Sequence, residues 1–219
     1  MNLLIIGAPG AGKGTMSNFL IDQYNLVHIS TGDMLREAMR NQTPLGLKVK
    51  ECMDSGMLVS DEIIHDIIVE RLNKDDIQNG FLFDGYPRTV AQAIDLESIL
   101  KQLDKKIDAI LNLQLSDEII IKRITGRRTC SKCGAIYNIY FNAPKTENIC
   151  DNCGEKLNQR GDDNEESLKV RLSEFNKNTK PVVNFYEKQN IVYNIDAAQD
   201  VDGELKDIQK VLEGLKWFR

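Results

Sequence analysis

The chain has 219 residues, of which 42% are hydrophobic and 28% charged, and its formal net charge is −5 at pH 7. This length allows one large α/β domain with insertions or two small domains, and the hydrophobic content supports a real core. The charge is spread over mixed-sign segments without a basic tail, which argues against nucleic-acid binding. No apolar run is long enough to span a bilayer, and the first is too short for a secretory leader. We therefore expect a cytoplasmic protein without membrane contact.

The first predicted strand, Leu3 to Ile6, leads directly into a glycine-rich loop, Gly7 to Thr15, and then into a helix from Met16 to Tyr24. This arrangement aims backbone N–H groups and the positive end of the helix dipole at one point, where a polyphosphate can bind. Lys13 adds a mobile ammonium group for the terminal phosphates. The usual pattern has Ser or Thr directly after the lysine, whereas here Gly14 intervenes and the hydroxyl is on Thr15. A glycine-rich turn without a ligand is the alternative, which the flanking strand, helix and lysine disfavour.

Alternating apolar strands and amphipathic helices continue along the chain and predict an α/β fold, a parallel sheet with helices on both faces. The four further strand candidates are Val27 to Ile29, Phe81 to Phe83, Ala109 to Leu113 and Ile191 to Ile195. A helix is expected from Asp61 to Asn73, because its five Ile and Leu residues share one face. We find no internal repeat.

Two gaps between strands are too long for simple crossovers, and we expect insertions there that stand over the carboxyl edge of the sheet. In the first gap the pattern predicts a helix from Met34 to Arg40, a break at Pro44 to Gly46, and a helix from Leu47 to Ser55 with Gly56 as its C-cap. In the second, Arg127 to Asp163, helical periodicity disappears, so we expect a small β-rich flap.

The flap contains two CxxC pairs, Cys130/Cys133 and Cys150/Cys153, which are separated by sixteen residues and are each followed by glycine. This is the spacing of a structural zinc ribbon, in which four thiolates fill the coordination shell and leave no position for water. Unrelated surface thiols and thioredoxin-type redox chemistry are the alternatives, and no βα unit flanks either pair. Cys52 stands alone and is interpreted as an apolar filler.

Asp84 directly follows a buried strand and is expected near the phosphate-binding loop, where a carboxylate can hold magnesium through its waters. A turn-capping aspartate is the alternative. Arginines gather at both hinges of the flap and on the helix after it, and such a cluster can neutralise phosphoryl oxygens. They are Arg123, Arg127, Arg128, Arg160 and Arg171. His28 and His65 have no partner pattern, and we expect satisfied structural roles for both.

These motifs together resemble the adenylate kinases, in the long form with a zinc-bearing lid. The resemblance covers essentially the whole chain and rests on several segments in the correct order. They are Gly7 to Thr15, Ser30 to Asp33, Asp84 to Thr89, Gly126 to Arg128 and Arg160 to Asp163. The family carries its loop hydroxyl at the position of Thr15. Two departures are Tyr86, where phenylalanine is commoner, and Cys153, where some relatives have aspartate.

The resemblance implies a nucleoside monophosphate kinase fold with a phosphate-loop core (residues 1–29, 60–126 and 164–219), a monophosphate-binding insertion (30–59) and a zinc-binding lid (127–163). The implied ATP site consists of Gly10, Ala11, Gly12, Lys13, Gly14, Thr15, Arg123, Arg127, Ile136, Tyr137 and Gln199. The implied AMP site consists of Thr31, Arg36, Met57, Leu58, Val59, Gly85, Tyr86, Pro87, Arg88, Gln92, Arg160 and Arg171. Asp33 and Asp84 would order magnesium waters, and Lys13, Arg88, Arg127, Arg160 and Arg171 would act on the moving phosphoryl group.

The expected reaction is reversible, Mg-dependent phosphoryl transfer from ATP to AMP, which gives two ADP and needs no general base. A monomer is expected by resemblance alone. Two alternatives stay open: a kinase for another nucleoside monophosphate, and a zinc-ribbon nucleic-acid-binding protein that uses ATP as a switch.

Overall fold

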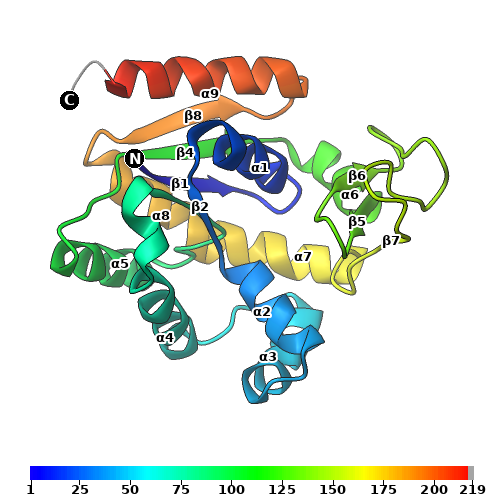
Figure 1. The fold of residues 1–219 in the computed structure, drawn as a ribbon, viewed down its shortest axis with the longest axis horizontal. Coiled ribbons are helices and arrows are strands. Elements are labelled where there is room, and N and C mark those ends of the chain that lie inside the picture. Colours follow the sequence, from blue (N-terminus) through cyan, green and yellow to red (C-terminus); the bar gives the residue numbers. More distant parts are fainter. Residues whose placement is uncertain (217–219) are drawn as a thin grey trace.

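The computed structural model describes residues 1–216 and places them in two sheets (Figure 1). The main sheet has the order β2-β3-β1-β4-β8, and each pair of neighbouring strands in it is parallel. Its strands are β1 (Asn2–Gly7), β2 (Val27–Ser30), β3 (Phe81–Asp84), β4 (Ala109–Gln114) and β8 (Val192–Asp196). The five predicted strands and the α/β fold are therefore confirmed, with each boundary within one residue of its prediction.

Helices cover both faces of this sheet, because alternate strand residues point to opposite sides. Leu4 and Ile6 of β1 join one core cluster with α4, α5 and α8, whereas Leu3 and Ile5 join another with α1 and α9. The helices on these faces are α1 (Lys13–Tyr24), α4 (Asp61–Leu72), α5 (Val90–Gln102), α8 (Lys180–Glu187) and α9 (Val201–Lys216). The sequence-predicted core segment 164–219 ends in three residues outside the described part of the chain.

The centre of the sheet positions the site. Strand β1 lies between β3 and β4, so the chain runs to one side after β1 and returns to the other after β3. Open α/β folds bind ligands at such a switch point, beyond the carboxyl ends of the strands. The glycine-rich loop starts there, at Gly7.

The first insertion consists of α2 (Thr31–Arg40) and α3 (Pro44–Ser55), which follow β2 (Figure 1). The prediction of a break at Pro44 to Gly46 is wrong, because Pro44 begins α3. Proline at the first helical position needs no N–H partner, and the Thr43 side chain caps the helix by accepting from Gly46 N at 3.1 Å. Gly56 ends α3 with φ 78°, as predicted for a C-cap.

The second insertion is a three-stranded antiparallel sheet with the order β6-β5-β7, and it projects at one end of the molecule (Figure 1). Its strands are β5 (Arg127–Cys130), β6 (Ile136–Asn138) and β7 (Leu157–Asn158). The expectation of a β-rich flap is confirmed. Helix α6 (Asp117–Thr125) leads into it, and α7 (Glu165–Glu174) leaves it.

Two short helical segments complete the described part. They are the 3-10 helix η1 (Asp75–Asn79) and the π-helical segment η2 (Phe175–Thr179), which joins α7 to α8. The π-helical turn brings Thr179 against the site, where its hydroxyl donates to the Arg88 carbonyl at 3.0 Å. Within residues 1–216, no helix combines the length and apolar character needed to cross a membrane.

Candidate active site

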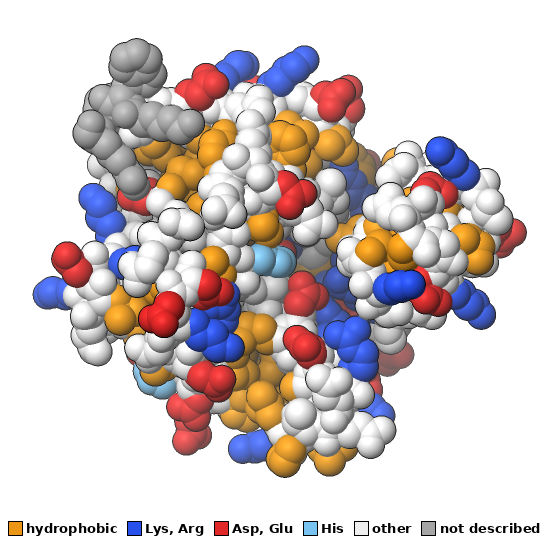
Figure 2. Space-filling model, in the orientation of Figure 1, with side chains coloured by type: hydrophobic (Ala, Val, Ile, Leu, Met, Phe, Trp, Pro, Cys, Tyr) orange, Lys and Arg blue, Asp and Glu red, His pale blue; other side chains and the backbone are white. Residues whose placement is uncertain are grey.

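A large cleft of about 1120 Å³ opens at the carboxyl edge of the main sheet, between the glycine-rich loop and both insertions. Figure 2 shows the hollow between the second insertion and the rest of the molecule, with charged side chains along its walls. The sequence-predicted residues that line it are Gly10, Gly12, Lys13, Gly14, Thr15, Asp33, Arg36, Leu58, Asp84, Gly85, Tyr86, Pro87, Arg88, Arg123, Arg127, Ile136, Tyr137, Arg160, Arg171 and Gln199. The fold thus gathers segments of both insertions around one cavity.

The glycine-rich loop takes a backbone path that side chains disfavour. Gly10 and Gly12 have φ values of 82° and 97°, and Gly12 is the N-cap of α1. Helix α1 starts at Lys13, three residues before the prediction, so the lysine and Thr15 belong to its first turn. The first N–H groups of a helix lack intrahelical partners, and an anion can satisfy them. The second insertion reaches this turn, because Ile136 Cδ1 lies 3.1 Å from where a Cβ on Gly14 would be.

Lys13 folds back over the loop. Its Nζ donates to the carbonyls of Gly7 and Ala8 at 2.8 and 3.0 Å. Burial lowers the pKa of Lys13 to about 8, an effect that Asp84 opposes and the nearby arginines Arg88, Arg171 and Arg127 strengthen. The ammonium group is therefore under-compensated, and an anionic ligand would restore its charge balance.

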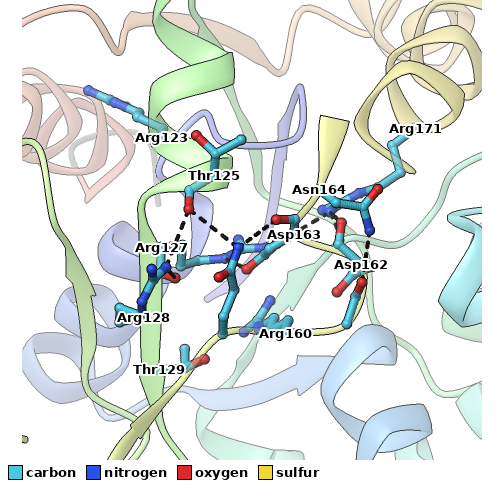
Figure 3. Close-up of polar contacts among 12 residues, drawn as sticks. Arg123, Thr125, Arg127, Arg128, Thr129, Arg160, Asp162, Asp163, Asn164 and Arg171 are labelled. Atoms are coloured by element: carbon cyan, nitrogen blue, oxygen red, sulfur yellow. Dashed lines mark hydrogen bonds and ion pairs between the residues drawn. The ribbon is translucent and has the colours of Figure 1, made fainter. Parts of the chain in front are cut away.

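Four arginines predicted from the sequence converge on the cleft from three parts of the chain: Arg88 follows β3, Arg127 and Arg160 lie at the two ends of the second insertion, and Arg171 lies on α7. Figure 3 shows the last three, together with Asp162 and Asp163, the acidic partners of Arg127 and Arg171. Burial, together with the positive charges of Arg171 and Arg36, lowers the pKa of Arg88 to about 10, and the nearby acids Asp84 and Asp162 oppose the shift only in part. The cluster therefore holds excess positive charge out of water, as a site for phosphoryl oxygens would.

Two aspartates position these arginines, and the sequence analysis gave them no role. Asp163 is buried and accepts from Arg127 Nε at 2.8 Å and from Arg127 Nη2 (Figure 3). Asp162 Oδ2 lies 3.0 Å from Arg171 Nη1. Arg128 differs from its neighbour, since it donates to the backbone carbonyls of Arg127 and Thr125 and does not line the cleft. The signal for the aspartates was present in the Arg160-Gly161-Asp162-Asp163 motif.

The carboxylates expected to order magnesium waters both line the cleft. Asp84 lies 3.5 Å from Ser17 Oγ and 3.6 Å from His28 Nε2, whereas Asp33 pairs with Arg36 at 2.6 Å. The satisfied structural role expected for His28 is only partly met, because its buried Nε2 has Asp84 nearby but no hydrogen-bond partner among the described residues. His65 does have a partner, Asp95 Oδ2 at 2.6 Å, and that hydrogen bond raises its pKa.

A smaller side pocket adjoins the cleft, and it gathers most of the remaining residues of the implied AMP site. Its lining includes Thr31, Met57, Leu58, Val59, Gly85, Tyr86, Arg88 and Gln92. Gln92 is held at both ends: its Oε1 accepts from Arg88 N at 2.7 Å and its Nε2 donates to Asp61 Oδ1 at 2.6 Å. Thr31 Oγ1 donates to the Gly85 carbonyl at 3.2 Å. The pocket therefore presents fixed polar groups on a mostly apolar wall.

Some predicted residues sit differently from their neighbours. Ala11 is fully buried, its N–H donates to the Ala8 carbonyl at 3.0 Å, and it does not line the cleft. Tyr137 reaches the cleft, but its hydroxyl accepts from Asp151 N at 2.9 Å and lies 3.7 Å from Cys150 Sγ, so it also supports the cysteine site.

The sequence analysis did not identify Glu204 as a site residue, although it is a buried carboxyl that lines the cleft. Its spacing to Ile208 and Leu212 on one helix face could have revealed it.

The four cysteines of the two CxxC pairs come together, with all their Sγ atoms within 4.8 Å of one another. Two of these separations, Cys130–Cys153 and Cys133–Cys150, are 3.5 Å. A zinc ion with bonds of about 2.3 Å to four sulfurs places those sulfurs about 3.8 Å apart, so the cluster fits zinc. Both following glycines have positive φ values, 75° for Gly134 and 72° for Gly154, which close the two turns. None of the four forms a disulfide in the described part of the chain.

The family model described as "Adenylate kinase" matches residues 5–191 of the chain. The chain is 48% identical over 216 residues to a protein named "Adenylate kinase" from Archaeoglobus fulgidus, which covers 99% of this chain and 100% of the relative. With the same coverage it is 49% identical to a protein of that name from Geobacillus sp. and 48% identical to one from Bacillus subtilis.

The chain is a member of the adenylate kinase family. The geometry of the site agrees with this membership. A kinase with two nucleotide substrates needs a nucleotide-sized cleft with a phosphate-binding loop, a cationic cluster and a side pocket.

Proposed function

We propose that this adenylate kinase family member catalyses reversible, magnesium-dependent transfer of a phosphoryl group from ATP to AMP, giving two ADP. The observation that carries the proposal is the position of Lys13 and four arginines around one cleft, with a helix N-terminus on one side and a fixed polar pocket on the other. ATP would bind along the loop and the second insertion. AMP would bind in the side pocket beside Gln92.

The chemistry needs alignment more than proton transfer. An anionic oxygen of AMP attacks the γ-phosphorus of ATP, the bond from that phosphorus to the β,γ-bridging oxygen breaks, and ADP leaves from the opposite side. Lys13, Arg88, Arg127, Arg160 and Arg171 would stabilise the charge on the transferring oxygens. Because AMP brings its own anionic nucleophile, no side chain has to remove a proton.

The two implied metals have different tasks. Asp84 and Asp33, both of which line the cleft, would hold the water ligands of magnesium, which would bind with ATP and neutralise phosphate charge. Zinc would be structural, because four thiolates leave no position for water. It would hold the knuckles of the second insertion, which we assign as a lid (127–163). Residues 30–59 would be the monophosphate-binding part and the remainder the core.

Water competes with AMP as acceptor, so a complete cationic cluster should form only when both insertions enclose the nucleotides. Support for such closure comes from the origin of the cluster: Arg127 and Arg160 lie at the ends of the lid insertion, and Arg36 lies on α2 of the other. We further propose a cytoplasmic monomer that acts on ATP, AMP and ADP and has neither nucleic acid nor membrane as partner.

A coupled assay for ADP formed from ATP plus AMP tests the proposal directly. Appreciable ADP formation that requires both nucleotides and magnesium is the expected result. ATP consumption without AMP would instead indicate an ATPase switch, and stimulation by nucleic acid would favour the zinc-ribbon alternative. The same assay with AMP, GMP, CMP and UMP as acceptors tests for a kinase of another nucleoside monophosphate, with AMP expected to be preferred.

A further inference from the structure

Glu204, on the first turns of α9, is a buried carboxyl that the structure leaves without a partner. The residue is 3% exposed, its Oε1 has no hydrogen bond, and no ion pair within 4.0 Å reaches it from any described residue. It nevertheless lines the large cleft. A buried polar atom is normally hydrogen-bonded, so an unpartnered oxygen on a residue that lines a cavity points to a group that a ligand completes.

Glu204 lies close to the glycine-rich loop and to Arg123 of α6. Both carboxylate oxygens lie 3.9 Å from where a Cβ on Gly12 would be, and Arg123 Nη1 lies 3.5 Å from the same point. Arg123 is fixed by donating from Nη2 to the Ala197 carbonyl at 2.9 Å. Gln199 and Val201 line the same end of the cleft. The carboxyl therefore lies next to the loop, on the side where the chain beyond β8 borders the cleft.

Burial of the Glu204 carboxyl is energetically unfavourable. Burial raises the pKa of Glu204 to about 7, because Arg123 lowers it by less than burial raises it and Asp196 raises it further. The face of α9 that carries Glu204 continues with Ile208 and Leu212, which are fully buried. An apolar residue would suit this helix face better, since an unpartnered buried polar atom destabilises the fold. Packing on this face of α9 therefore does not explain why the residue at position 204 is a glutamate.

We propose that Glu204 is a specificity-determining residue of the donor site that accepts a hydrogen bond from the nucleoside part of the donor nucleotide. Above pH 7 Glu204 is mostly ionised. The ionised carboxylate repels phosphate oxygens and accepts hydrogen bonds, so its partner in that pH range is a hydrogen-bond donor. On a donor nucleoside triphosphate, these are the ribose hydroxyls and the exocyclic amine of the base. The inference rests on the proposed placement of ATP along the loop.

Steady-state kinetics with four donors tests the proposal, with AMP saturating. The donors are ATP, 2′-deoxyATP, 3′-deoxyATP and inosine triphosphate, which has a carbonyl in place of the exocyclic amine. In the wild type, kcat/KM should fall about tenfold or more for the analogue that lacks the group Glu204 binds. In Glu204→Ala, kcat/KM for ATP should fall by about the same factor. The ratio of kcat/KM for ATP to that for this analogue should then shrink to within about twofold. The analogue whose preference disappears identifies the group.

Two further variants separate specificity from folding. Glu204→Gln keeps an acceptor oxygen and should retain the preference for ATP over the ribose analogues. Asp202→Asn removes an exposed carboxyl two residues earlier on the same helix and should match the wild type. Unchanged donor preferences in Glu204→Ala, or a wild type that uses all four donors equally, would overturn the proposal. Absence of ADP formation by the wild type from ATP and AMP would instead overturn the proposed function.

Discussion

Arg127 and Asp163, the first and last residues of the proposed lid, are joined by a two-pronged ion pair. Arg127 Nε donates to Asp163 Oδ2 at 2.8 Å, and Nη2 donates to Oδ1. The Asp163 side chain is fully buried and that of Arg127 is 15% exposed. Arg171 Nη1 also lies 3.7 Å from Asp163 Oδ1. One carboxylate therefore ties together both ends of the insertion and orients two arginines of the cleft.

Replacing Asp163 with asparagine should destabilise the protein and slow the reaction. The change leaves the buried guanidinium group of Arg127 without its anion, and breaking such a buried pair typically costs about 3–5 kcal/mol. Arg171 keeps Asp162 as an ion-pair partner at 3.0 Å. Turnover should fall as well, because Arg127 loses its fixed orientation. Thermal or urea unfolding and the ADP assay measure the two effects. The control is Glu166→Gln, an exposed acid on α7 that should change stability by less than about 0.5 kcal/mol. Equal stability of the two variants would show that the buried Arg127–Asp163 ion pair does not stabilise the protein.

Lys13 should impose an alkaline limit on the reaction. Its pKa is lowered to about 8, so the ammonium form is present below pH 8 and is lost as the pH rises through that value. For the free enzyme, kcat/KM for ATP should decline above pH 8. Lys13→Met should lower turnover by about 10²- to 10³-fold and abolish this decline, with a melting temperature near that of the wild type. A pH profile of Lys13→Met that still falls near pH 8 would assign the limit to another group.

Arg88 should contribute more to turnover than its charge alone explains. Its Nε donates to the Gly85 carbonyl at 2.8 Å, and its own carbonyl accepts from Thr179, so the guanidinium is aimed rigidly at the cleft. Arg88→Lys keeps the charge but loses the planar fork, and Arg88→Met loses both. We expect kcat to fall by orders of magnitude in Arg88→Met and by a smaller factor in Arg88→Lys. Wild-type turnover in Arg88→Met would remove Arg88 from the mechanism.

The cysteine cluster should bind one zinc ion per chain and stabilise the lid. Metal analysis of protein purified under reducing conditions should find it, and a strong chelator should lower the melting temperature. A loss of about 2 kcal/mol corresponds to roughly 4–8 °C for a chain of this size. Cys150→Ser should reproduce the effect, whereas Cys52→Ser, outside the cluster, should not. Metal-free protein with an unchanged melting temperature would rule out a structural zinc.

Glu204 should make stability fall with rising pH. Its pKa is about 7 in the fold against 4.5 for the ordinary group, so the folded state binds the proton more tightly. Stability from this residue is therefore full below pH 4.5 and is lost as the pH rises towards 7, by about 3 kcal/mol in total. Glu204→Gln should be more stable than the wild type at pH 8 and equal to it near pH 4.5. Asp202→Asn should show no such pH-dependent difference.

Local patterns sufficed for much of this protein. Strand β1 and its loop were recognisable because an apolar run that is followed directly by glycines and a lysine is compatible with few backbone conformations. The two CxxC pairs predicted the cysteine cluster, since the two cysteines of each pair are brought together by a turn of only four residues. The break at Pro44 was misplaced because proline can begin a helix as well as end one, and Thr43, which settles the matter, acts through a cap visible only in the fold.

The sequence by itself determined the five parallel strands, the phosphate-binding loop and the zinc-type cysteine cluster, because each is signalled by a pattern of residues close together in the chain. Only the tertiary structure decided what the buried charges contact. Asp163 meets Arg127 across 36 residues of sequence, His28 faces Asp84 from a neighbouring strand, and Glu204 reaches the wall beside Gly12. Such pairings follow from how sheet and helices pack, and solvent exclusion, which sets their energies, does not exist until the chain has folded.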